Sequence, residues 1–386
     1  MDKAKVSEVV KKYTMVIALI LVTLFFTWKT GGKMLLPQNV TNLIAQNAYV
    51  FILATGMLLC ILTGGNIDLS VGSVVCFVGA VGGSLMVNKH VNTYLAILIM
   101  LGVGLLIGAW QGFWIAYVRI PPFIVTLAGM LIFRGLSNVV LDGLTIAPMP
   151  DNYLELFNNY VVNPLGGNGI NLTCMLAGVL ACVIYLVVVF NGRRGRTKKG
   201  YETEPMAGVV VKSVIICAVI FAFMFRLAQY KGIPNVLVWV LVVILVYAYI
   251  TSKTTIGRYF YAVGGNEKAT KLSGINTDNV YFMAYLNMGF LSAMAALVTI
   301  ARLNSANHTA GTNYEMDAIG SCFIGGASAY GGTGTVPGVI IGATLMGVIN
   351  LGMNIMGVDS NYQKVVKGLV LLAAVIFDVV SKKKSQ

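Results

Sequence analysis

The chain has 386 residues and a net charge of +13, and its composition is 57% apolar but only 11% charged. Because a soluble globular domain carries about 25% charged residues, this composition excludes an ordinary soluble enzyme and predicts an all-α polytopic membrane protein. The basic residues stand in short clusters between apolar runs, as membrane orientation requires, and no interleaved aromatic and basic face indicates a nucleic-acid partner.

Apolar runs of membrane-spanning length follow one another along almost the whole chain. A transmembrane helix needs roughly 20 apolar residues, which predicts about 10–12 such helices in one domain covering the lipid bilayer. The predicted spans are, in order, Tyr13–Trp28, Leu43–Thr63, Ser70–Val87, Tyr94–Val118, Pro121–Leu141, Asn171–Phe190, Val209–Tyr230, Asn235–Ile250, Val280–Ala301, Val339–Val358 and Val365–Val380. We interpret the first as an uncleaved span, because no small-residue cleavage site follows it. The run Ala318–Ala329 is too short to cross alone.

The distribution of basic residues predicts the orientation of the chain. With the N-terminus in the cytoplasm, most of the 27 lysines and arginines lie on the inner side, so we expect both termini to be cytoplasmic. The same assignment makes residues 191–208 a basic cytoplasmic loop and residues 253–278 a second cytoplasmic loop. It puts the segment 142–170, which contains several prolines and glycines, outside as an exposed extracytoplasmic loop.

Motifs for catalysis or nucleotide binding are absent from the sequence. It has no G-x-x-x-x-G-K-[ST] motif, no nucleophile elbow and no H-E-x-x-H motif. The six cysteines lie inside apolar runs and the two histidines have no partner at ligand spacing, so we expect no disulfide framework, metal site or cofactor. We therefore predict a transport subunit without its own ATPase site, driven by another protein.

Two glycine-broken polar segments interrupt the apolar runs. The first, Leu62–Ser73, contains one carboxylate, and the second covers residues 325–338. Broken helices at matching positions of a transporter point to a substrate site, so we expect both segments to line the path of the solute. Two interpretations of Asp68 remain open: it lines this path, or it caps the following helix near the cytoplasmic surface. The predicted pathway and gate residues are Gly65, Asn66, Asp68, Ser70, Arg134, Asn138, Gly331, Gly332 and Thr333.

Arg134 is an isolated charge within the span Pro121–Leu141. It either snorkels along this span toward the interface or faces the central path together with Asn138. Other spans contain neutral amides, which suit a hydroxyl-rich ligand because they supply both donors and acceptors. Hydrogen bonds between helices are the alternative explanation for these amides.

The second cytoplasmic segment contains a compact pattern from Gly257 to Ile275. Asn266 is placed to cap a short helix, Glu267–Leu272, and Gly274 is placed to end it. A short capped helix with apolar residues beside it predicts a docking element for a partner, and an interfacial helix resting on lipid is the alternative. The residues predicted to form this docking element are Gly264, Gly265, Asn266, Glu267, Ala269, Ser273 and Gly274.

These motifs resemble the permease subunits of bacterial ABC importers for monosaccharides, a group related to the branched-chain amino-acid permeases. The resemblance rests on Thr63–Ser73, Pro121–Met130 with Arg134-Gly135, Gly257–Ile275 and Ile324–Gly338, and it runs over most of the chain. It is closest to the longer xylose-type and multiple-sugar permeases, since an insert around residues 191–250 distinguishes the chain from the shorter ribose type.

The resemblance implies partners and a location. It implies an all-helical permease of the bacterial inner membrane that works as a pair, most simply a homodimer, around a central path. A sugar-binding protein would deliver the solute outside. A cytoplasmic ATPase with two fused nucleotide domains would dock on residues 257–275 and drive the change between outward- and inward-facing states.

Three alternatives to a sugar permease remain open from the sequence. The first is a related permease for nucleosides, an autoinducer or branched-chain amino acids. The second is a secondary carrier that uses Asp68 as its proton or sodium site. The third is a passive channel.

Overall fold

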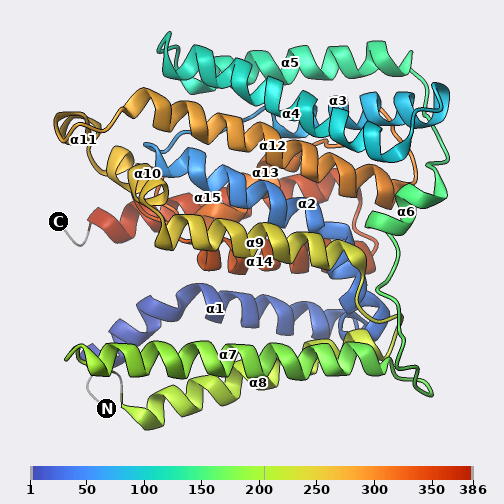
Figure 1. Cartoon of the computed structure of the whole chain (residues 1–386). Coiled ribbons are helices and arrows are strands. Elements are labelled where there is room, and N and C mark those ends of the chain that lie inside the picture. Colours follow the sequence, from blue (N-terminus) through green and yellow to red (C-terminus); the bar gives the residue numbers. More distant parts are fainter. Residues whose placement is uncertain (1–2, 204, 384–386) are drawn as a thin grey trace.

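The structure, a computed structural model, describes residues 3–203 and 205–383, and all the elements in these ranges are helical (Figure 1). The first half contains α1 (Lys3–Lys29), η1 (Lys33–Leu35), α2 (Pro37–Leu62), α3 (Val71–Gly83), η2 (Ser84–Asn88), α4 (Thr93–Ala116), α5 (Pro122–Leu141), α6 (Asp151–Phe157) and α7 (Leu172–Lys198). The second half contains α8 (Met206–Ala228), α9 (Asn235–Lys253), α10 (Thr255–Gly265), α11 (Glu267–Leu272), α12 (Thr277–Leu303), α13 (Tyr314–Ile324), α14 (Val336–Ile355) and α15 (Ser360–Lys383). The predicted all-α class is confirmed for the part of the chain that the structure describes.

The long helices lie side by side in one bundle. Both chain termini, α10 and α11 lie at the same end of it, here called the termini end, and α6 lies at the opposite end, the α6 end (Figure 1). Within the described residues, nine helices are long and apolar enough to cross a membrane. The apolar part of α1, Thr14–Lys29, is shorter than these nine. The protein is therefore a multi-pass membrane protein.

Burial separates a central group of helices from a peripheral pair. The apolar stretch of α2 is 89% buried inside the protein, whereas the stretches of α7 and α8 are each 11% buried. In α2, the residues from Ala48 to Leu62 are all buried. Because apolar side chains that are not covered by protein suit a lipid environment, α7 and α8 form a lipid-facing hairpin at the edge of the bundle.

Irregular backbone leads into two of the central helices, α3 and α13, and α13 is short. The 11 residues of α13 extend only about 16 Å, less than the roughly 30 Å of a bilayer core. This agrees with the prediction that the apolar piece here is too short to cross. The segment 64–70 precedes α3, and the segment 304–313 precedes α13. Positive φ angles at Gly64 and Gly65 (121° and 77°) allow the turn after α2.

Three predicted loops contain more helix than expected. In the expected loop 191–208, α7 continues to Lys198, because arginine and lysine are good helix formers and cations are favoured in a last helical turn. The expected loop 142–170 contains α6, which buries Tyr153 and Phe157 after Pro150. In 253–278, α10 begins where the Thr254 side chain accepts a hydrogen bond from the Gly257 N–H.

Candidate functional site

The start of α3 and the start of α13 meet inside the bundle. Gly72 of α3 packs against the backbone of Gly311, which lies just before α13, and an added Cβ at Gly72 would lie 2.6 Å from Glu315 Oε2. Gly311 has a φ of +74°. We call this contact the half-helix junction. Since helix N-termini carry partial positive charge, polar and anionic groups are stabilised where two of them face each other.

The carboxylate at this junction is held by a short hydrogen-bonded chain. Asp68 is only 2% exposed, and its Oδ1 accepts from the Ser70 N–H (2.8 Å) and the Ser70 Oγ–H (2.6 Å). The Gln111 amide of α4 donates to Ser70 Oγ at 2.6 Å. An added Cβ at Gly129 of α5 would lie 2.5 Å from Gln111 Nε2. The chain of bonds therefore joins the segment before α3 to α4, with α5 packed against it.

The structure decides between the two interpretations of the local role of Asp68. The N-cap residue of α3 is Ser70, and it makes no side-chain capping bond to the helix. Asp68 lies two residues before this position and binds Ser70 itself, so the capping interpretation is wrong. A local hydrogen bond of this kind shapes a turn and leaves the first N–H groups of the helix without a side-chain cap.

Arg134 has a role that neither sequence interpretation gave. Its Nη1 donates to the carbonyl oxygens of His308 (2.9 Å) and Ala310 (2.8 Å), so α5 holds the irregular segment before α13. Asn138, one turn along α5, is exposed. The half-buried Arg134 is therefore fixed on the segment before α13, whereas Asn138 is exposed on the same helix. The sequence signal for this partner segment was a polar stretch rich in Asn, Thr and Gly between two apolar runs.

A second junction brings together three Gly-Gly dipeptides from distant parts of the chain, Gly64-Gly65, Gly264-Gly265 and Gly331-Gly332. An added Cβ at Gly331 would lie 2.5 Å from Gly64 Cα, and one at Gly332 would lie 2.9 Å from the Gly265 nitrogen. The Gly332 N–H donates to the Leu62 carbonyl at 3.0 Å. We call this contact the glycine junction. Only residues without a side chain allow the backbones to approach so closely.

The two broken segments therefore contact each other only in part. Leu62–Gly65 meets residues 331–332 at the glycine junction, but α3 faces the segment 304–313 at the half-helix junction. Thr333 is exposed, and its carbonyl accepts from the Ser328 N–H at 2.9 Å. Asn66 is half-buried and donates to the Thr63 carbonyl at 3.2 Å. The predicted pathway residues thus divide between two junctions, and Asn138 and Thr333 belong to neither.

The short helix predicted at Glu267–Leu272 is confirmed as α11. Asn266 Oδ1 accepts from the Ala269 N–H at 3.0 Å, which caps the helix. After the last turn, the Ser273 hydroxyl donates to the Ala269 carbonyl at 2.9 Å, and Gly274 takes a φ of +83°. Asn, with its short side-chain acceptor, and Gly, with its freedom at positive φ, fix both ends locally.

Arg119 joins this element to the transmembrane helices. It lies between α4 and α5, its Nη1 is 2.8 Å from Glu267 Oε1, and its Nη2 also pairs with Asp278 at the start of α12. Glu267 also accepts from the Tyr281 hydroxyl at 3.1 Å. Partial burial raises the pKa of Glu267, but the hydrogen bond and the charge of Arg119 outweigh it, and the pKa lies below its usual value.

Comparison with known proteins identifies the family. Residues 39–153 and 153–375 match the family described as branched-chain amino acid transport system / permease component. The chain belongs to this permease family. The xylose transport system permease protein XylH of Escherichia coli (strain K12) is 35% identical over 373 residues, which cover 97% of this permease and 93% of that protein.

Other relatives agree with this assignment. The xylose transport system permease protein XylH of Haemophilus influenzae is 34% identical over 96% of this permease and 97% of its own length. The ribose import permease protein RbsC of Escherichia coli (strain K12) is 34% identical over 88% of this permease and 85% of its own length. The comparison with solved structures gave no significant match.

The permease presents a groove beside α11 at the termini end. Ten residues of α10, the 273–276 turn and the start of α12 line a hollow of about 350 Å³ that contains both polar and apolar groups. The Leu272 side chain at the end of α11 is 90% exposed. An exposed apolar side chain next to a groove is typical of a surface that another protein covers.

A buried ion pair, which the sequence did not reveal, holds α13 against its neighbours. Lys367 Nζ of α15 is 2.9 Å from Asp317, which is only 1% exposed. The Tyr49 hydroxyl of α2 donates to Asp317 Oδ2 at 2.5 Å, and the Tyr49 ring stacks on Tyr314. Within the described residues, no group of three or more His, Cys, Asp or Glu side chains is placed to hold a metal ion.

Proposed function

We propose that the permease is the membrane-spanning subunit of an ATP-binding-cassette importer and carries a monosaccharide across the bacterial inner membrane. The observation that carries the proposal is similarity along nearly the whole chain to permeases whose names specify xylose transport and ribose import. The nine apolar helices found in the described residues and the predicted absence of an ATPase site support a transport subunit that another protein drives.

The half-helix junction is the proposed gate. Asp68 and Ser70 shape the backbone before α3, and Arg134 holds the backbone before α13. Both segments are irregular backbone inside an apolar bundle, which a membrane protein tolerates only where protein or a water-filled cavity satisfies it. Movement of either segment would change the packing of Gly72 on Gly311. We therefore propose that the gate opens by separation of these two segments.

The ATPase, with two fused nucleotide domains, is proposed to dock on α10 and α11. This makes the termini end cytoplasmic, in agreement with the predicted distribution of basic residues. The groove beside Gly274 and the exposed Leu272 support a docked partner. Two connections lead inward from this surface: Arg119 to the start of α5, and the glycine junction to the segment before α3.

Two further partners complete the proposal. The permease acts as a homodimer, because several large apolar side chains on α5, among them Leu131 and Val139, are exposed in the single chain. An extracytoplasmic sugar-binding protein docks at the α6 end, where the segment 142–170 lies. That protein delivers the sugar, and the ATPase supplies the free-energy difference between the two states.

Substrate competition in the assembled importer tests the proposed class. The permease, the ATPase and the binding protein encoded beside it are reconstituted together, and uptake of labelled xylose is measured with excess xylose, ribose, leucine or a nucleoside as competitor. Competition by a pentose and not by leucine or the nucleoside is expected. Competition by leucine or the nucleoside alone would contradict the monosaccharide proposal and favour the related permeases.

A further inference from the structure

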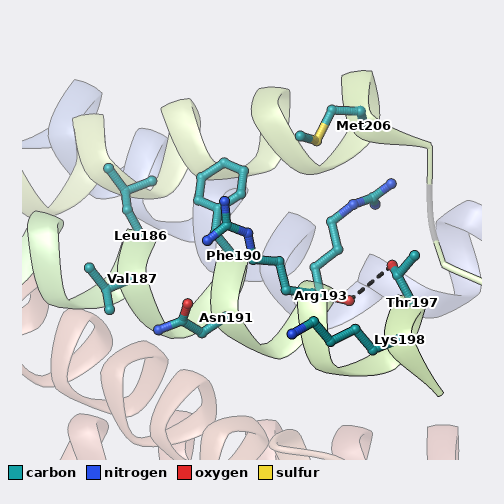
Figure 2. Close-up of a pocket in the computed structure, with 9 residues that line it drawn as sticks. Leu186, Val187, Phe190, Asn191, Arg193, Thr197, Lys198 and Met206 are labelled. Carbon is teal, nitrogen blue, oxygen red and sulfur yellow. Dashed lines mark hydrogen bonds between the residues drawn. The ribbon is translucent and has the colours of Figure 1, made fainter.

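The peripheral hairpin carries a basic and apolar hollow that the transport function does not use. Residues of the last three turns of α7 and the first residue of α8 line a hollow of about 760 Å³ at the termini end, shown in Figure 2. Its apolar wall consists of Leu186, Val187, Phe190 and Met206, and its basic side consists of Arg193, Arg194 and Lys198. Figure 2 shows Leu186 and Phe190 pointing toward the helix that carries Met206.

The charge around this hollow is strongly positive. Five basic residues follow one another closely in the sequence, against only Glu202 and Glu204 in the same connection: Arg193, Arg194, Arg196, Lys198 and Lys199. A neighbouring hollow of about 500 Å³ is lined by Arg196 of α7 and by Lys253 of α9. Cations from two helices therefore surround the end of α7.

The position of the hollow defines what it meets. The apolar stretches of α7 and α8 are each only 11% buried, so the hairpin faces lipid along its length. The basic residues begin directly after the apolar run, at the level of the lipid headgroups. A favourable interaction of cations with a helix C-terminus explains basic residues in the last turn but does not explain the apolar wall next to them.

We propose that this hollow binds an anionic phospholipid of the leaflet at the termini end. The phosphate lies against Arg193, Arg194 and Lys198, because a guanidinium group donates two parallel hydrogen bonds to the oxygens of one phosphate. The acyl chains lie along Leu186 and Phe190, which are half-buried, and along the exposed Val187, which belongs to the lipid-facing surface of α7. A lipid bound in this hollow holds the α7–α8 hairpin in a fixed position relative to α9. Lys253 of α9 lines the neighbouring hollow.

Native mass spectrometry of the purified, delipidated full-length permease tests this site. The protein is titrated with phosphatidylglycerol and with phosphatidylcholine of the same acyl chains. We expect phosphatidylglycerol to bind at least tenfold more tightly, and the double variant Arg193→Gln/Arg194→Gln to lose this preference. The matched control Lys268→Gln/Lys271→Gln removes two exposed charges from α11 at the same end, and it should keep the preference.

Two additional measurements separate the alternatives. Inorganic phosphate at millimolar concentration should leave phosphatidylglycerol bound, and displacement would indicate a free-phosphate site and overturn the proposal. Equal binding of the two lipids, or equal losses in the two double variants, would also overturn it. If the double variant does not fold, Arg194→Lys and Arg194→Gln are compared, and the lysine variant should retain more phosphatidylglycerol than the glutamine variant.

Discussion

Arg119 Nη1 and Glu267 Oε1 lie 2.8 Å apart, and this ion pair joins the connection before α5 to the short helix α11. The two residues are 148 positions apart in the sequence. Arg119 also pairs with Asp278, so it links α11 to the start of α12 and to the connection before α5. In the proposed importer, this is the most direct route from the ATPase surface to α5.

Replacement of Arg119 tests this route. Arg119→Gln should lower sugar uptake by about fivefold or more in the reconstituted importer, while ATP hydrolysis continues. The protein should remain folded, because a surface ion pair contributes only about 0–1 kcal/mol to stability. The matched control is Arg226→Gln, a change at an exposed position on α8 whose Nη1 donates to Gln229 Oε1 at 3.4 Å. Parallel losses of uptake and hydrolysis in Arg119→Gln would contradict a coupling role.

The lowered pKa of Glu267 gives a pH dependence for the anchoring of α11. A carboxyl group whose pKa is lower in the folded protein adds stability above its unfolded pKa, near 4.3, and loses it as the pH falls through the folded value. Hydrogen-exchange protection of α11 should therefore be constant from about pH 7 to 5.5 and should fall below about pH 4. Glu267→Gln should abolish this loss of protection at low pH. An unchanged loss of protection in that variant would mean that another titrating group causes it.

The substitution Gly331→Ala tests the close approach of the backbones at the glycine junction. Gly331→Ala places a Cβ 2.5 Å from Gly64 Cα and forces a φ of +85° on alanine, which alone costs about 1–2 kcal/mol. We expect lower thermal stability and a severe loss of uptake. Gly102→Ala in α4 is the control, because a Cβ there meets nothing within 4 Å. If both variants behave like the unmodified protein, the three segments do not approach as closely as described.

Two substitutions of Asp68 distinguish the contribution of its hydrogen bonds from that of its charge. Asp68→Asn keeps an oxygen that accepts from Ser70, so the turn before α3 and most of the ATP-dependent uptake should persist. Asp68→Ala leaves the buried Ser70 N–H and hydroxyl without this acceptor, at a cost of about 1–3 kcal/mol, and uptake should fall about tenfold. Abolition of uptake in Asp68→Asn would favour the secondary carrier that uses this carboxylate as an ion site.

Some of these features follow from the sequence and others do not. The helix α11 was predictable because Asn266 and Gly274 determine its two ends through local backbone geometry. The role of Arg119 was not predictable from the sequence. The packing of α4 against α12 brings its partners near, and no local sequence pattern encodes that packing. The role of the segment 304–313 does not follow from the sequence, because it depends on backbone carbonyl oxygens that Arg134 binds.

The predicted helix boundaries also differed from the observed ones where two local preferences of the sequence competed. The basic end of α7 was predicted as a loop because charge was taken to end the span, yet arginine and lysine continue a helix well. The helix α6 was missed because prolines surround it, although Pro150 directly before a helix is compatible with its start. Asp317 was missed because its partners, Tyr49 and Lys367, come from two other helices.

The central claim is that this permease moves its solute only when a separate ATPase drives it. The direct measurement is uptake of labelled sugar into vesicles that contain the permease alone, and into vesicles that also contain the ATPase and the binding protein. We predict accumulation against a gradient only in the complete vesicles and only with ATP. Accumulation by the permease alone, with or without an ion gradient, would contradict the account.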